Sequence, residues 1–315
     1  MESIGSPWMW GAFIAFVLGM LALDLGVFHR KAHKVGVREA ALWSVVWVAL
    51  ALTFNLILWR AFGPQRGMEF LTGYLIEKAL SMDNIFVFVL IFGAFSVPDI
   101  YQHRVLFWGI LGALALRALF VGLGAALIAS FHWVLYLFGA FLVITGIKML
   151  VARNQGFDPR NNPLFRLFRK AVPAVETYHG PAFTVVEGGR RYATPLLLVL
   201  VAVELTDLVF AVDSVPAIFA VTRDPFIVFT SNIFAILGLR SLYFLLTGVA
   251  DRFHLLKVGL SLVLVFVGLK MLVVEAYKVP VAWSLGIIGL LVGGSVAASL
   301  IWPKAPHPAG PPATS

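Results

Sequence analysis

The sequence predicts an all-α polytopic membrane protein with about nine transmembrane helices, six of which form an inverted repeat of two three-helix units. Hydrophobic residues make up 60% of the 315 residues, charged residues only 13%, and the mean hydropathy is +0.92. Apolar runs of about 20 residues recur along the chain, and a helix of that length crosses the ~30 Å hydrocarbon core of a bilayer. Similarity between segments about 122 residues apart predicts the repeat.

Nine apolar segments are expected to cross the bilayer as helices. The first has no basic stretch before it and no small-residue cleavage site after it, so we expect a retained helix rather than a signal peptide. The segments cover approximately residues 8–28, 41–62, 70–95, 105–128, 133–151, 194–221, 226–249, 255–274 and 281–301.

The connections also carry local signals. Residues 163–170 mix aromatic and basic side chains, which predicts an interfacial helix. Residues 183–194 predict a small β-hairpin that turns at Gly188 and Gly189. The chain thus divides into a two-helix segment (1–66), a first repeat unit (67–152), a cytoplasmic loop (153–192), a second repeat unit (193–275), a ninth span (276–302) and a tail expected to be disordered (303–315).

Two pairs of segments carry the internal repeat. Residues 146–150 recur as residues 268–272 at an offset of 122, and residues 79–85 match residues 202–208 at an offset of 123. Because each unit has an odd number of spans, the second unit enters the membrane from the opposite side. This is the inverted repeat of many secondary transporters.

The basic residues predict the orientation. Of the 24 lysines and arginines, 15 lie in loops that are cytoplasmic if the N-terminus is outside, four lie in the opposite loops, and five lie within spans or at their ends. The positive-inside rule therefore favours an external N-terminus and a cytoplasmic C-terminus. Most of the basic residues behind the net charge of +8 lie in short loops between spans, where they set orientation. We therefore expect no nucleic-acid partner. The chain has no cysteine, which excludes thiolate metal ligands and cysteine catalysis.

Acidic residues interrupt the third and sixth spans. The third span carries Glu77 and Asp83, and the sixth carries Glu204, Asp207 and Asp213. A carboxylate at the bilayer centre costs about 2.5 to 3.5 kcal/mol on the most lenient scale. We therefore expect the five carboxylates to converge on a positive charge.

Helical spacing defines the faces on which these residues lie. Glu77, Ser81 and Asn84 share one face at spacings of four and three, and Glu204 and Asp207 share another. The repeat makes Asn84 equivalent to Asp207 and Ser81 equivalent to Glu204.

Asp213 lies half a helical turn away from Glu204 unless the helix is irregular. Pro216 removes the hydrogen bond to the Val212 carbonyl and predicts such an irregularity, which would make that carbonyl a further oxygen ligand. Carboxylate, amide, hydroxyl and carbonyl oxygens suit Mn²⁺, Mg²⁺ or Ca²⁺ rather than Cu⁺ or structural Zn²⁺. The metal-ligand candidates are Glu77, Asp83, Asn84, Glu204, Asp207 and Asp213, with Asp24, Ser81 and Ser214 as further candidates.

A structural alternative is that the carboxylates pair with Arg117 and Arg240, which are repeat-equivalent and lie near the middles of the fourth and seventh spans. Two arginines cannot neutralise five carboxylates. We therefore interpret the arginines as counter-charges beside a cation site. For Asp24, near the inner end of the first span, site membership and simple contact with the membrane interface remain equal alternatives.

The two acidic segments, residues 77–86 and 203–218, resemble the signature segments of the TerC/Alx family, a branch of the LysE transporter superfamily. Residues 23–31 resemble the N-terminal signature of that family, and the similarity covers all nine spans without the tail. The resemblance implies a bacterial inner-membrane protein that exports divalent manganese, in a family named for tellurium resistance. The five acidic residues carry over individually.

The sequence therefore predicts a secondary transporter that exports Mn²⁺ as its substrate, with no organic cofactor. No nucleotide-binding Gly-Lys-Ser/Thr loop is present, so ATP is not the direct energy source. Five close carboxylates cannot all stay ionised without a cation, so exchange of protons for metal is expected. The open alternatives are transport of Ca²⁺ or a tellurium oxyanion, and delivery of manganese to exported enzymes through protein contacts.

An intramembrane hydrolase is not expected, because the chain lacks a His-Glu-x-x-His motif and its seven histidines fall at span ends, in loops or in the tail. We therefore do not expect an enzyme. Gly289 and Gly293 form a GxxxG pattern in the last span, which indicates close helix packing and a homodimer as one interpretation.

Overall fold

The computed structural model describes residues 3–28, 36–131, 133–151, 165, 170, 172–247, 255–277 and 279–302, and for residues 24–28, 82, 83, 86 and 213 it describes the backbone alone. The expected interfacial helix at 163–170 lies outside this part of the chain except for Phe165 and Lys170. The expected disordered tail at 303–315 also lies outside it.

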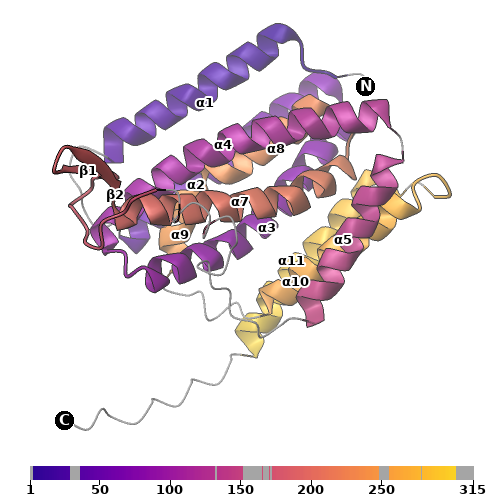
Figure 1. The fold of residues 1–315 in the computed structure, drawn as a ribbon. Helices are drawn as coiled ribbons and strands as arrows, with labels where there is room; N and C mark the ends of the chain where they lie inside the picture. The colour runs from indigo at the N-terminus through magenta and orange to yellow at the C-terminus, as the bar shows by residue number, and fades with distance from the viewer. Residues whose placement is uncertain are drawn as a thin grey trace.

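The fold is helical, as Figure 1 shows, and the expectation of an all-α polytopic membrane protein is confirmed. Each helix lies on one of the nine apolar segments, and the seventh segment contains two helices. The helices are α1 (Pro7–Phe28), α2 (Val37–Phe62), α3 (Pro64–Ala94), α4 (Asp99–Ser130), α5 (Val134–Val151), α7 (Pro195–Phe219), α8 (Pro225–Leu237), α9 (Leu239–Leu246), α10 (Leu256–Leu272) and α11 (Val281–Ile301).

Fewer helices meet the requirements for a membrane span than there are apolar segments. Counted over the described residues, five helices (α2, α4, α5, α7 and α11) are long and apolar enough to cross a membrane, and the bent pair α8 and α9 makes a sixth. Helix α10 has only 17 residues, and α3 carries the first acidic segment. The expected count of nine is therefore not established by length and composition.

The helix break lies in the seventh segment rather than at Pro216. Helix α7 continues through Pro216, which stands in its last turn, so the missing hydrogen bond does not end the helix there. Helices α8 and α9 instead meet at an angle of 40° on either side of Gly238. The Nζ of Lys78 in α3 donates a hydrogen bond to the Ala235 carbonyl at 3.3 Å, which places a cation at the C-terminal end of α8.

Helices α5, α10 and α11 form a group beside the other helices (Figure 1). Helices α5 and α10 contact each other most extensively, and they cross at two glycines. A Cβ on Gly139 would lie 2.9 Å from the Gly268 carbonyl oxygen, and a Cβ on Gly268 would lie 2.7 Å from the Gly139 carbonyl oxygen. Only glycine permits backbones to approach this closely.

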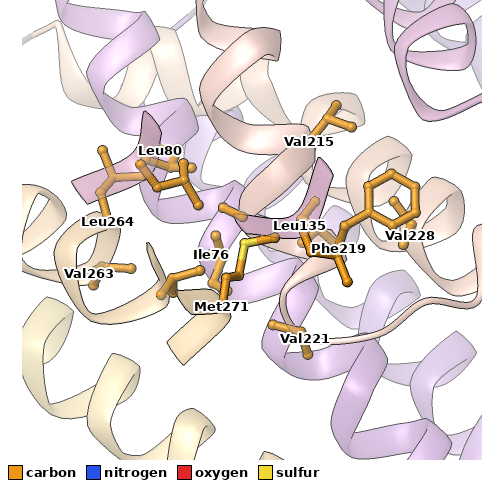
Figure 2. Packing of buried hydrophobic residues seen from close by; sticks show 14 of the residues in the cluster. Ile76, Leu80, Leu135, Val215, Phe219, Val221, Val228, Val263, Leu264 and Met271 are labelled. Atoms are coloured by element: carbon orange, nitrogen blue, oxygen red, sulfur yellow. The ribbon is translucent and has the colours of Figure 1, made fainter. Parts of the chain in front are cut away.

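A buried apolar cluster joins this group to α3, α7 and α8, as Figure 2 shows. Side chains in such a cluster pack closely, as in other protein interiors. The residues labelled there are Ile76, Leu80, Leu135, Val215, Phe219, Val221, Val228, Val263, Leu264 and Met271.

The connection before α7 contains the expected hairpin. Strands β1 (Thr184–Glu187) and β2 (Arg190–Ala193) pair antiparallel, with Glu187 opposite Arg190. Gly188 and Gly189 have φ values of 56° and 78°, the left-handed conformation that a two-residue hairpin turn requires. The hydroxyl of Tyr178 donates a hydrogen bond to the Phe95 carbonyl at 2.7 Å, so this connection packs against the end of α3.

Candidate cation site between α3, α4, α7 and α8

The buried face of α3 carries three polar side chains in the middle of an apolar helix. Glu77, Ser81 and Asn84 are exposed at only 0%, 1% and 2%. Their helical spacing places them on one face, and α3 contacts both α7 and α8. The polar stripe of α3 therefore lies inside the protein, away from lipid.

Arg117 of α4 is the cation at the centre of this region. Its side chain is 1% exposed, and its Nη1 contacts Oε1 of Glu77 closely and donates to Oγ of Ser214 at 2.8 Å. Its Nη2 lies 3.4 Å from Oδ1 of Asp207. One guanidinium group thus bridges carboxylates from α3 and α7, and a buried charge is tolerated only when it is paired in this way.

Asn232 of α8 is a member of the network that sequence reasoning missed. It is fully buried, donates from Nδ2 to Oε2 of Glu77 at 3.3 Å and accepts from Nη1 of Arg117 at 3.3 Å. A signal was available, because an asparagine in an apolar span is costly and marks a functional position. Asn232 carries no charge, so it does not stand out among the acidic residues of the spans.

Three buried oxygen atoms on α3 and α7 accept no hydrogen bond from the described residues. They are Oγ of Ser81, Oδ1 of Asn84 and Oδ2 of Asp207. The amide Nδ2 of Asn84 is 3.5 Å from Oδ1 of Asp207, so two of these three groups are in direct contact across α3 and α7. Buried polar atoms without partners are rare in folded proteins, and oxygen atoms of these types are the ligands that hard cations prefer.

Glu204 lies one helical turn before Asp207 on α7 and is half-buried. Its carboxylate packs directly on Gly112 of α4, where an added Cβ would overlap it. Gly112 therefore leaves the space that the Glu204 carboxylate occupies.

The structure brings Glu77 and Asp207 together at Arg117 and places Glu204 beside them on α7. Within the described part of the chain, no three Asp, Glu or His side chains are grouped closely enough to hold one metal ion. The side chains of Asp24, Asp83 and Asp213 lie outside that part. A cation here would therefore rely on amide and hydroxyl oxygens as well as on carboxylates.

Two further candidates take positions that the sequence did not specify. Ser214 on α7 accepts the hydrogen bond from Arg117. Arg240 is 6% exposed and stands at the start of α9, directly after the break at Gly238. Arg117 and Arg240, which match in the repeat expected from the sequence, thus occupy different local settings, because Arg117 lies within a continuous helix.

Comparison with known proteins agrees with this architecture. The profile of the family described as "Integral membrane protein TerC family" matches residues 62–306. An uncharacterized membrane protein of Myxococcus xanthus is 58% identical over 299 residues, which cover 95% of this chain and 94% of that protein. A protein of Escherichia coli K12 named as a proposed membrane-bound redox modulator, Alx, is 50% identical over 302 residues, which cover 93% of this chain and 94% of that protein.

A more distant relative, an uncharacterized membrane protein of Rickettsia bellii, is 39% identical over 292 residues, which cover 93% of this chain and 97% of that protein. No solved structure matches the chain. The family profile covers more than half of the chain, and the relatives match it over nearly their full lengths. The resemblance noted in the acidic segments is thereby confirmed: the chain is a multi-pass integral membrane protein that belongs to the TerC family.

Proposed function

We propose that this protein is a secondary transporter that exports divalent manganese across the bacterial inner membrane through the site between α3 and α7. The observation that carries the proposal is the set of buried oxygens on Ser81, Asn84 and Asp207 that lack partners among the described residues. In an apolar bundle such atoms lose their hydrogen bonds to water and gain nothing in return. A bound cation would satisfy them.

The chemistry of these oxygens supports a hard divalent cation. Carboxylate, amide and hydroxyl groups suit Mn²⁺, Mg²⁺ and Ca²⁺, and the absence of cysteine removes the ligands that softer metals prefer. Manganese is the substrate that the resemblance to the family implies. A role in redox modulation, as in the name of the Escherichia coli relative, would here act through the level of a redox-active metal, because the chain has no thiols.

Contacts between repeat-equivalent residues support the inverted repeat. At an offset of 122, Gly139 is equivalent to Ser261 and Gly146 to Gly268. Gly139 meets Gly268, and a Cβ on Gly146 would lie 2.8 Å from the Ser261 carbonyl oxygen. The second contact is equivalent to the first with the roles of α5 and α10 exchanged. A pseudo-two-fold axis between the two units would produce such a pair of contacts. We infer that the two units exchange inward-facing and outward-facing arrangements around the site.

Proton coupling is part of the proposal. Glu77 and Asp207 share the single charge of Arg117, and Glu204 adds a further carboxylate one turn away. Protons are the simplest compensation for the excess negative charge when no metal is bound. Binding of Mn²⁺ would then release protons, and the transporter would export metal in exchange for proton entry.

Uptake of Mn²⁺ into everted membrane vesicles tests the proposal. Vesicles that contain the wild-type protein should accumulate Mn²⁺ when the lumen is acidic, and collapse of the pH gradient should slow the accumulation. Asp207→Asn should remove the uptake while the protein remains in the membrane. Uptake equal to that of vesicles without the protein would overturn the assignment as an exporter.

A further inference from the structure

The contacts of Arg117 divide between the two repeat units. Its own helix α4 and its partner Glu77 on α3 belong to the first unit. Its other partners belong to the second unit: Ser214 and Asp207 on α7 at 2.8 Å and 3.4 Å, and Asn232 on α8 at 3.3 Å. The guanidinium therefore has one close ionic contact within its own unit, to Glu77, and longer polar contacts to the other.

The guanidinium contacts one oxygen of the Asp207 carboxylate, and the other oxygen is buried without a hydrogen-bond partner among the described residues. Oδ1 of Asp207 faces both Arg117 and the amide of Asn84, whereas Oδ2 accepts no hydrogen bond from described residues. A divalent cation held by Asp207, Asn84 and Ser81 would share the Asp207 carboxylate with the guanidinium. Two cations so close together repel strongly inside a protein, where charges are screened less than in water.

We propose that Arg117 is an internal competitor of the transported cation. Without metal, its guanidinium neutralises Asp207 and is attached to α7. When a divalent cation binds, the guanidinium leaves Asp207 and Ser214 and stays with Glu77. The inference rests on the proposed function, because it requires that the buried oxygens bind a divalent cation.

This arrangement has two consequences for transport. An exporter must release its substrate, and a tethered cation that returns to Asp207 lowers the affinity enough for release. The same exchange breaks the attachment between Arg117 and α7, so metal binding loosens a contact that joins the two repeat units. A proton bound to a carboxylate can dissociate, whereas the guanidinium charge is permanent, because arginine stays protonated in proteins.

The direction in which Arg117→Gln changes the dissociation constant for Mn²⁺ tests this inference. Mn²⁺ binding would be measured by calorimetry on the purified full-length protein, and Mn²⁺ export by the same protein in proteoliposomes. Arg117→Gln removes the competitor, so the dissociation constant for Mn²⁺ should fall, on the order of tenfold, while the export rate should fall as well. A purely structural counter-charge predicts the opposite, a loss of binding together with a loss of transport.

Arg66→Gln is the matched control. Arg66 also pairs with a carboxylate on α3, Glu69, at 2.9 Å, and it stands outside the candidate site. Its removal should leave the dissociation constant unchanged. An equal tightening in both variants would overturn the inference, because it would show a general effect of charge.

Ser214→Ala decides the question if Arg117→Gln does not fold. It keeps every charge and removes only a hydrogen bond that attaches the guanidinium to α7, so Mn²⁺ should again bind more tightly, by a few-fold. Unchanged or weaker binding by folded variants, beside clear binding by the wild type, would overturn the competitor role and leave the proposed function standing. No Mn²⁺ binding by the wild type would overturn both.

Discussion

Asn84 and Asp207, which are 123 residues apart and match in the proposed internal repeat, contact each other across α3 and α7, with Nδ2 3.5 Å from Oδ1. Contact between equivalent residues places them next to the axis that would relate the two units. A site on such an axis keeps its position when the units exchange conformations, which is what a transporter with a fixed midplane site requires.

Asp207→Asn should abolish manganese resistance in a host that lacks other manganese exporters. The substitution keeps the side-chain volume and removes the charge of a carboxylate that contacts Arg117 through Oδ1 and whose Oδ2 has no partner among the described residues. Asp83→Asn is expected to have the same effect, from its place in the acidic segment. Growth on manganese measures the effect, and immunoblots of membranes control for protein level. Wild-type tolerance in either variant would remove that residue from the site.

Glu77→Gln should destabilise the protein strongly. It leaves the fully buried Arg117 with Asp207, at 3.4 Å, as its remaining carboxylate partner, and removal of one partner of a buried ion pair costs about 3–5 kcal/mol. The midpoint of thermal unfolding in detergent should fall clearly. Glu187→Gln, in the exposed hairpin, should change the midpoint little. Equal midpoints for the two variants would show that the Glu77–Arg117 ion pair contributes little to stability.

Gly112→Ala should impair transport although it adds a single methyl group. The new Cβ would overlap the Glu204 carboxylate and force that side chain to move. Gly109→Ala, one turn earlier on α4, meets only the Cγ1 of Val203 at 3.1 Å and should be tolerated better. Rates of Mn²⁺ uptake in vesicles compare the two. Equal rates would show that the position of Glu204 does not matter for transport.

A reporter fused after Arg153 should be cytoplasmic, and a reporter in the loop at residues 222–225 should be external. The expectation combines the distribution of basic residues with the odd number of spans between the two sites. Compartment-specific reporter activity measures it. The same location for both reporters would refute the proposed orientation of the second unit.

Manganese flux in proteoliposomes should move protons in the opposite direction. Protons and Mn²⁺ compete for the same carboxylates, so the apparent affinity for Mn²⁺ should fall as the pH is lowered. Glu204→Gln removes one of these carboxylates and should reduce the proton movement per manganese ion. A lumenal pH dye reports the counterflow. Full metal transport without proton movement, at clamped voltage, would point to another driving force.

Local features of this fold could be predicted from sequence because they depend on neighbouring residues. The helix positions follow from apolar runs, and the hairpin follows from two adjacent glycines that adopt left-handed conformations. The break at Gly238 was missed because a glycine in an apolar run has no distinctive neighbours. Pro216 was the stronger local signal. It stands in the last turn of α7, and the helix continues through it to Phe219.

The candidate site depends on contacts between distant helices, and sequence alone could only propose its members. Spacing placed Glu77, Ser81 and Asn84 on one face of a helix. It could not show that Arg117 would meet Glu77 and Asp207, because that meeting requires α3, α4 and α7 to pack together. The partners of Asn232 depend on packing in the same way, since α8 must lie against both Glu77 and Arg117.

Neighbouring residues on α3 connect the ion pair to the bent helix. Glu77 contacts Arg117, and the next residue, Lys78, holds the end of α8 at the Ala235 carbonyl. Gly238 leaves room for this approach, because a Cβ there would lie 2.9 Å from the Lys78 Nζ. A rotation of α3 about its axis that carries Glu77 away from Arg117 must also carry Lys78 away from α8. The same short segment of α3 therefore positions both the Glu77–Arg117 ion pair and the C-terminal end of α8.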